Sequence, residues 1–200
     1  PFKYLVLSCA FALAAMLSKP SAIVLPAIAI LIDCLVLHRR LGAAARRVAP
    51  WVAVAIPIAV IAKLVQPGHG PLDYGVLDRV AVAAFSLAFY SGKVVWPAQL
   101  AFDYGHTPEA VLADARWWLI VFVFGAMLVS TAALWRRFAP LAVGIFLFII
   151  ALSPVLGLVR FDFQLYSTVG DHYLYLPMLG VAWIVAGLRR RWMQAIMAAL

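Results

Sequence analysis

Apolar runs of membrane-crossing length constrain this chain more than any other feature of its sequence. A helix needs roughly 17 to 25 mostly apolar residues to cross about 30 Å of hydrocarbon. Such runs recur along the 200 residues, with arginine-rich or proline- and glycine-rich breaks between them. Segments 22–37 and 117–135 are apolar on every face, whereas barrel strands would alternate apolar and polar residues. We therefore predict an all-α fold, a polytopic bundle of transmembrane helices.

Composition supports this class of protein. Hydrophobic residues make up 66% of the chain and charged residues only 12%, which excludes an ordinary soluble domain. No phosphate-binding loop or serine-hydrolase motif occurs in the sequence. The net charge of +8 does not indicate a nucleic-acid partner, because membrane topology explains where the arginines lie.

The arginines predict the orientation in the membrane. Nine of the 16 basic residues flank three short loops, which the positive-inside rule places in the cytoplasm. They are Arg39, Arg40, Arg46, Arg47, Arg136, Arg137, Arg189, Arg190 and Arg191. Six of the eight acidic residues fall in the predicted loop segments between these basic loops, outside segment 78–95, so the opposite, periplasmic or lumenal side carries the polar loops.

We interpret residues 1–200 as a single membrane domain with about six spanning helices. The count of crossings is consistent only if segment 78–95 does not cross, and its charged and polar residues favour an interfacial or re-entrant helix. The chain starts at Pro1 and stops inside an apolar run. We therefore expect it to be a fragment of a longer protein.

The most informative candidate site is the triplet Asp171-His172-Tyr173, at the mouth of an apolar helix. Ionisable residues in a membrane segment are costly and usually functional. Asp171 is a possible catalytic residue. An ion pair of Asp171 with Arg160 or Lys93, which would only hold the loop, is an equal alternative.

Two lysines are candidates for binding a phosphate. Lys19 precedes Pro20 at the end of an apolar helix, where it either snorkels to the interface or offers a fixed charge. Lys93 follows Tyr90 at a spacing of three, so both can share one helix face near the outer headgroups. The nearby Trp96 is most simply an aromatic-belt anchor.

The loop 102–110 carries Asp103, His106 and Glu109 within seven residues. Because their spacing matches no metal motif, we interpret the segment as a substrate-binding loop and expect no metal ligands. Cys9 and Cys34 lie in apolar spans and fit small buried hydrophobic residues.

Three ordered motifs resemble those of one family. Segment 17–26 reads LSKPSAIVLP, segment 90–104 matches YxxKxxWPxxL, and segments 154–158 and 171–177 match PVxGL and DRYxYLP. Together they resemble the transmembrane-and-tetratricopeptide-repeat protein O-mannosyltransferases and their bacterial relatives, over about residues 11–185. One departure is His172, which stands where that family typically has arginine, so its charge would depend on pH.

The resemblance implies the C-terminal part of a GT-C glycosyltransferase membrane domain, with tetratricopeptide repeats often following. Such an enzyme moves a sugar, mannose or similar, from a polyprenyl-phosphate carrier to an acceptor hydroxyl of a protein or glycan, on the periplasmic or lumenal face. A bacterial inner membrane is the expected location. The catalytic acidic residue of GT-C enzymes usually lies in the first outward loop, which would precede Pro1.

Within this chain we expect the donor phosphate to be bound by Lys19, Lys93, Arg160 and His172. The residues expected to line the substrate are Tyr90, Trp96, Asp103, His106 and Tyr173. No cofactor is expected beyond the polyprenyl-phosphate sugar, which is a substrate. A polytopic transporter or flippase, and a non-catalytic membrane anchor for a repeat domain, are the alternatives.

Overall fold

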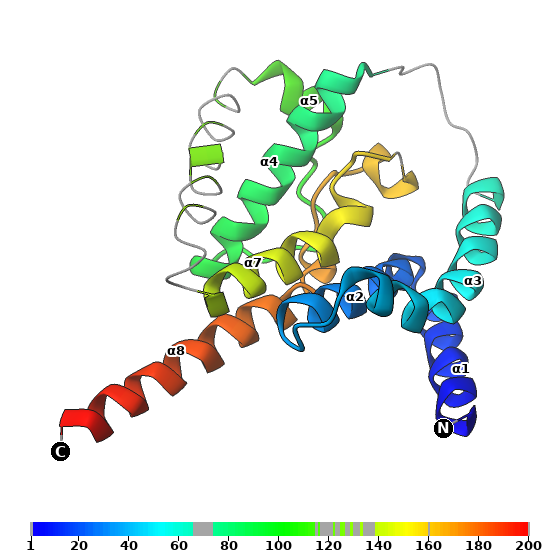
Figure 1. Cartoon of the computed structure of the whole chain (residues 1–200). Coiled ribbons are helices and arrows are strands. Elements are labelled where there is room, and N and C mark those ends of the chain that lie inside the picture. Colours follow the sequence, from blue (N-terminus) through cyan, green and yellow to red (C-terminus); the bar gives the residue numbers. More distant parts are fainter. Residues whose placement is uncertain are drawn as a thin grey trace. The chain divides into compact units, whose positions relative to one another are not determined.

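The computed structural model describes residues 2–65, 74–114, 139–159 and 161–199, together with isolated positions between 116 and 133. Within these residues all regular secondary structure is α-helix or 3-10 helix, and no strand occurs, which confirms the predicted all-α class (Figure 1). The chain divides into two compact units, Pro1–Leu72 and Asp73–Leu200, and each is described by itself.

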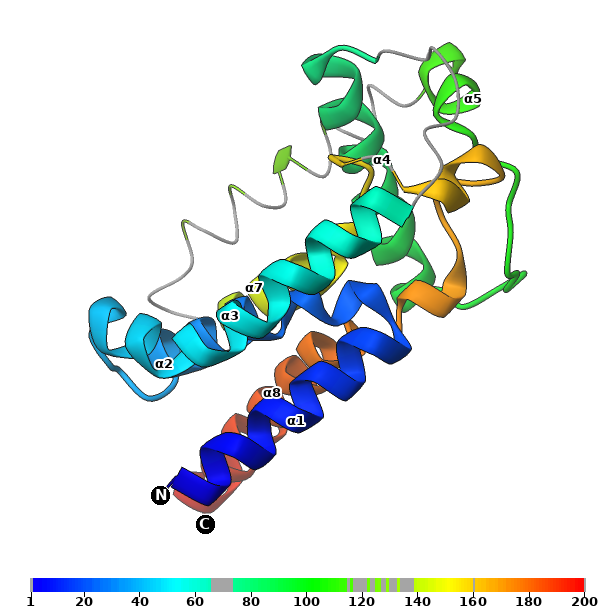
Figure 2. The ribbon, with the colours of Figure 1, turned by 90° about the vertical axis from the view of Figure 1, so that its right-hand side faces the viewer.

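The first unit is built on α3 (Leu41–Val65), which contacts both α1 (Phe2–Ser18) and α2 (Leu25–Leu35) (Figure 2). Met16 of α1 is fully buried and packs with Ala12 and Ala55 in its core. The helix predicted over 22–37 corresponds to a continuous helical segment over 20–35, whose start is a 3-10 helix, η1 (Pro20–Val24), and whose remainder is α2. Each begins with a proline in its first turn, where the missing N–H costs nothing.

Helix α3 has the properties of a membrane span. It is 25 residues long, and among the described residues it is the one helix both long and apolar enough to cross a bilayer. Only 11% of its most apolar window is buried, unlike the core helix of a soluble protein. Shorter apolar helices cover 3–18, 20–35, 139–155 and 178–189. The predicted bundle of about six spans remains a prediction.

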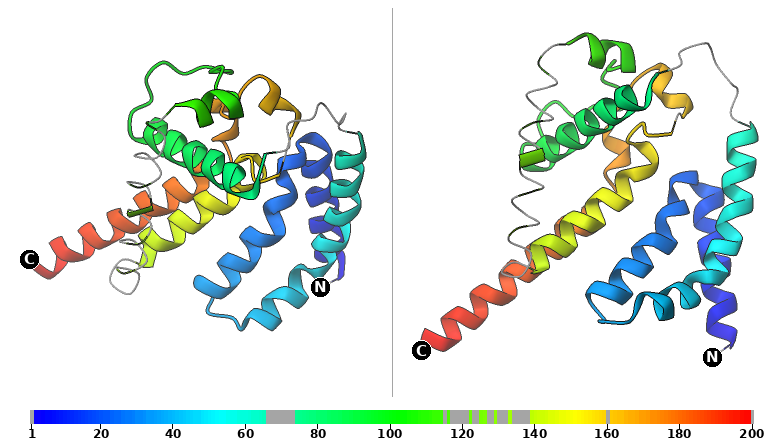
Figure 3. Two further views of the ribbon diagram at one scale, coloured as in Figure 1. Left: turned by 90° about the horizontal axis from the view of Figure 1, so that it is seen from above. Right: turned by 45° about the horizontal axis from the view of Figure 1, so that its top comes forward.

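In the second unit, α7 (Ala139–Leu152) and α8 (Met178–Ala199) run side by side (Figure 3). Their backbones approach closely because glycines face each other. A Cβ on Gly144 would lie 2.6 Å from the Gly180 carbonyl oxygen, and one on Gly180 would lie 2.8 Å from the Phe148 nitrogen. Small residues at such crossings are typical of helices packed in membranes.

Helix α4 (Val76–Val95) packs on this pair, and α5 (Pro108–Ala113) contacts α4. Tyr90 of α4, Leu152 of α7 and Val169 are fully buried in the shared core. The helix predicted over 78–95 is thus confirmed, and whether it lies in the interface remains a prediction. The span predicted over 117–135 falls mostly outside the described residues.

Short 3-10 helices form the loop between α7 and α8: η2 (Ser153–Val155), η3 (Asp162–Leu165) and η4 (Asp171–Tyr173). Helix α8 begins at Met178, five residues after Tyr173, where the apolar run of the sequence starts. Proline at 177 explains the delay, because the residue before a proline is kept out of the helical region. The Asp171-His172-Tyr173 triplet therefore occupies η4, just before the apolar helix.

Candidate functional site

Two loops of the second unit are joined by their backbones. The Thr168 N–H donates to the His106 carbonyl at 2.7 Å, and the Asp171 N–H donates to the Ala101 carbonyl at 3.2 Å. Gly170 permits this approach, because a Cβ there would lie 2.5 Å from the Phe102 carbonyl oxygen. The connection after α4 and the loop before α8 thus form one structure, with Asp171 at the junction.

Neutral groups hold the Asp171 carboxylate. Its Oδ2 accepts the Ala101 N–H and the Tyr104 hydroxyl, both at 2.6 Å. Its Oδ1 is shielded from solvent and has no hydrogen-bond donor within the described part of the chain. Lys93 does not pair with it there, and Arg160 lies outside the described residues. Asp171 is therefore fixed through one oxygen and keeps the other for a further donor.

Tyr90 supports the same loop from the core. Its hydroxyl accepts the Gly170 N–H at 3.0 Å, and the side chain is fully buried. Burial raises the pKa of this phenol well above its ordinary value, so it stays protonated. Tyr90 is thus a core residue that packs against the loop of Asp171. It is not among the residues that line the pocket next to the Lys93 ammonium.

Lys93 lies in the last turn of α4 and contacts the segment that follows the helix. Its ammonium donates to the carbonyls of Ala98 at 2.6 Å and Gln99 at 3.1 Å. It also lies over the Tyr104 ring, 4.6 Å from the centroid, and over the Phe89 ring at 5.4 Å. An ammonium has three donors, so one N–H remains for a ligand.

A pocket of about 570 Å³ opens beside this ammonium. Its walls are mostly apolar, and Trp96, which is 76% exposed, stands at its edge. The lining residues are Phe85, Ala88, Phe89, Gly92, Lys93, Trp96, Ala98 and Gln99. Apolar walls with a single cation suit an amphiphile that has an anionic group.

An aromatic stack flanks Asp171. The His172 ring lies parallel to Phe102, with centroids 4.4 Å apart, and it meets Tyr173 at 3.9 Å. Tyr173 packs against Phe163 as well, and burial raises its pKa to about 12. His172 and Tyr173, the other two residues of the predicted triplet, are thus half-buried and make contacts between aromatic rings.

The other predicted residues of loop 102–110 have separate environments. His106 is half-buried, stacks with Tyr104 and meets the ring of Phe89 in α4 edge-on. Asp103 is exposed and accepts the Gly105 N–H at 2.7 Å, a local turn. Within the ranges that the structure describes, no three His, Cys, Asp or Glu side chains gather as metal ligands would.

Lys19 belongs to the first unit, at the exposed turn between α1 and η1. Its part in a phosphate site shared with Lys93 remains a prediction.

Comparison with known proteins found no match. No family model, no curated protein and no solved structure matches this chain. The family resemblance of the motifs therefore remains a prediction, and the function has to be inferred from the geometry of the site.

Sequence reasoning missed three groups of this site: Tyr104, the backbone of Ala101, and Gly170. Tyr104 is the last residue of motif segment 90–104, and Gly170 directly precedes Asp171, so both lie next to residues that the sequence had already singled out. Their role depends on contacts between residues about 70 positions apart, such as the bond of Tyr104 with Asp171 across 67 positions. No local spacing indicates such a pair.

Proposed function

We propose that this chain is part of a polytopic membrane glycosyltransferase that moves a sugar from a polyprenyl-phosphate carrier to an acceptor hydroxyl. The observation that carries the proposal is the α4 pocket, where one ammonium meets apolar walls. The ring of Tyr104 under this ammonium connects it to the Asp171 carboxylate, which is not part of the pocket lining. A polyprenyl phosphate combines these features, an apolar chain and an anionic head. The order of the resembling motifs supports the same reading.

Lys93 would bind the phosphate of the donor. Its two carbonyl contacts fix the ammonium, and its third N–H is available to a phosphate oxygen. When the bond between the sugar C1 and the phosphate oxygen breaks, negative charge grows on that phosphate. A fixed cation stabilises this charge more in the transition state than in the bound donor.

Asp171 is the candidate in this chain for the acceptor side. The acceptor hydroxyl gives its proton to a base, its oxygen forms the new bond to C1, and polyprenyl phosphate leaves. The Oδ2 of Asp171 is held by Tyr104 and Ala101. Its Oδ1 has no donor among the described residues but is shielded from solvent, so it would accept this hydroxyl only after the loop around it has moved. An acidic residue outside this chain, as in the resembling family, is the alternative base.

The charge pattern supports the proposed membrane topology. The arginine loops fit the cytoplasmic side, and the loops bearing Lys93 and Asp171 then face the periplasm or lumen. The partners would be the bilayer, the polyprenyl-phosphate sugar and a protein or glycan acceptor, in the bacterial inner membrane.

The test measures binding of radiolabelled polyprenyl-phosphate mannose to the full-length protein in proteoliposomes. We expect Lys93→Met to weaken binding about tenfold or more, since a hydrogen bond to a charged group contributes about 1.5–3 kcal/mol. Lys63→Met, a lysine of α3, is the matched control and should bind like the wild type.

Lys93 also holds two carbonyls, so thermal unfolding of each variant is measured alongside. Unchanged donor binding by a folded Lys93→Met protein would reject the phosphate role. Donor binding without sugar transfer would instead favour the transporter or the non-catalytic anchor.

A further inference from the structure

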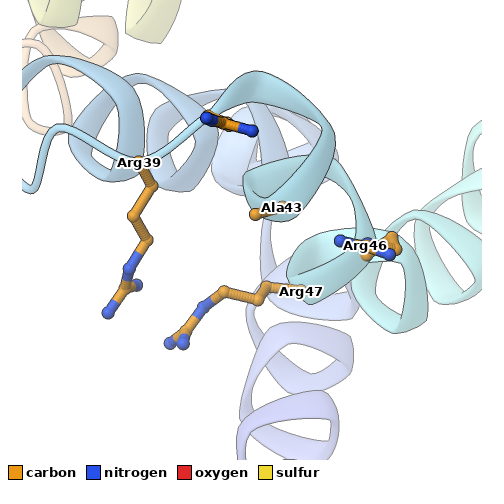
Figure 4. Close-up of a pocket in the computed structure, with 5 residues that line it drawn as sticks. Arg39, Ala43, Arg46 and Arg47 are labelled. Atoms are coloured by element: carbon orange, nitrogen blue, oxygen red, sulfur yellow. The ribbon is translucent and has the colours of Figure 1, made fainter.

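The first unit contains a second, distinct pocket, which is lined by arginines. It has a volume of about 530 Å³ and lies at the start of α3 (Figure 4). Its lining is Arg39, Arg40, Ala43, Arg46 and Arg47. Four guanidinium groups around one small residue form a concentrated positive site with room for a ligand.

Asp33 neutralises only part of this charge. Its side chain, on a residue that is 8% exposed, pairs with Arg39 at 2.7 Å and with Arg47 at 3.3 Å. Figure 4 shows Arg39 and Arg47 extending in the same direction from the loop and from α3. Four guanidinium charges against one carboxylate leave three positive charges.

Arg40 and Arg46 carry the unneutralised part of this charge. Both are exposed, and within the described residues neither has an acidic partner. Arg40 directly precedes α3, and Ala43 and Arg47 share one face of its first turns at a spacing of four. The small Ala43 leaves the space between the guanidiniums open.

The position of the pocket along α3 indicates its ligand. Beyond Arg47, residues 48–65 of the helix extend for about 27 Å at 1.5 Å per residue, close to the thickness of the hydrocarbon layer. If α3 crosses the bilayer as proposed, the guanidiniums lie at the depth of the lipid phosphates. Guanidinium groups bind phosphate through paired hydrogen bonds, which a lysine cannot reproduce.

We propose that this arginine pocket, defined by Arg39, Arg40, Arg46 and Arg47, binds the phosphate of an anionic phospholipid headgroup. The ligand differs from the donor proposed for the α4 pocket, and its binding requires no sugar transfer. The three surplus charges favour a headgroup with more than one negative charge over zwitterionic phosphatidylcholine. The membrane placement of α3 is the one step shared with the proposed function.

Binding is tested with the full-length protein in nanodiscs of phosphatidylcholine, titrated with cardiolipin and read by native mass spectrometry. Each basic residue near an anionic surface contributes about fivefold in affinity. The double variant Arg40→Gln/Arg46→Gln should therefore bind cardiolipin about 30-fold more weakly. Arg136→Gln/Arg137→Gln removes the same net charge from another basic loop and should lose much less.

Asp33→Asn provides a variant with the opposite expected effect. It removes the one carboxylate that neutralises the pocket, so cardiolipin should bind several-fold more tightly than to the wild type. This variant keeps the proposal testable if the double arginine variant fails to fold.

Three results would overturn the proposal. One is an equal loss of affinity in both arginine pairs, which would indicate general charge attraction. Another is weaker lipid binding by a folded Asp33→Asn protein. The third is inorganic phosphate competing at concentrations equal to those of the lipid, which would assign the pocket to a soluble anion. Retained lipid binding in a protein without transferase activity would leave this inference intact.

Discussion

Asp171 shows how single residues build the candidate site. Its Oδ2 joins the Tyr104 hydroxyl and the Ala101 N–H, and Tyr90 holds the adjacent Gly170 from below. Because Tyr104 also lies under the Lys93 ammonium, one ring connects the anionic and the cationic side of the site. Tyr104 is thus a positioning residue for both.

Removing the Tyr104 hydroxyl should therefore loosen the loop. We expect Tyr104→Phe to lower the free energy of unfolding by about 1–3 kcal/mol, because the half-buried Asp171 carboxylate loses a donor. Tyr166→Phe alters a tyrosine that is 65% exposed and should stay within about 0.5 kcal/mol of the wild type. Denaturant unfolding in mixed micelles measures both, and equal stabilities would contradict the assigned hydrogen bond.

At the scale of elements, the α7–α8 pair depends on glycine. Gly180 lies against the backbone of Gly144 and Phe148, and a side chain there has no space without moving a helix. In a membrane, where lipid is as apolar as the helices, such close packing at small residues holds neighbouring helices together.

Gly180→Ala should separate these helices. The added methyl group meets main-chain atoms, and overpacking of this kind costs about 1–3 kcal/mol. Gly42→Ala is the control, because a Cβ at Gly42 meets nothing within 4 Å. Thermal unfolding should show a lower midpoint for the first variant only. A midpoint unchanged by Gly180→Ala would refute the close approach.

Helix α3 carries the membrane assignment at this scale. Its apolar side chains are largely exposed, including Ile56 at 58% near the middle of the helix. Lipid is the environment that would cover them.

A translocon insertion assay on segment 41–65 tests this assignment. We expect the wild-type segment to insert. Ile56→Asp should add about 2.5–3.5 kcal/mol to the insertion free energy and reduce the inserted fraction sharply. Ile56→Val is the matched apolar control. A wild-type segment that stays out of the membrane would remove α3 as a span.

The sequence predicted some helix limits closely. The helix predicted over 78–95 corresponds to α4 (Val76–Val95), and the apolar run 22–37 corresponds to the helical segment over 20–35. The 3-10 geometry of η1 and the start of α8 only at Met178 were not predicted. Proline stands at both places: Pro20 begins η1, and Pro177 directly precedes α8.

At the scale of the whole molecule, the sequence singled out charged residues of the second unit as candidates but did not predict their hydrogen-bond partners. Lys93 and Asp171 were candidates, and an ion pair of Asp171 with Arg160 or Lys93 was one alternative. In the structure Lys93 instead contacts carbonyls, and Asp171 contacts a hydroxyl and an amide. Composition predicts which charges are costly in an apolar chain. Which neutral groups satisfy them depends on the tertiary fold, which brings positions 101, 104 and 171 together.

Sugar transfer tests the central claim most directly. Membranes that contain the full-length protein are supplied with radiolabelled polyprenyl-phosphate mannose, and label in protein is measured against membranes from an empty vector. We predict transfer by the wild type and by Lys63→Met, and at least a tenfold loss in Lys93→Met and Asp171→Asn. Absence of transfer by a folded, inserted wild-type protein, or full activity of both site variants, would contradict the glycosyltransferase account.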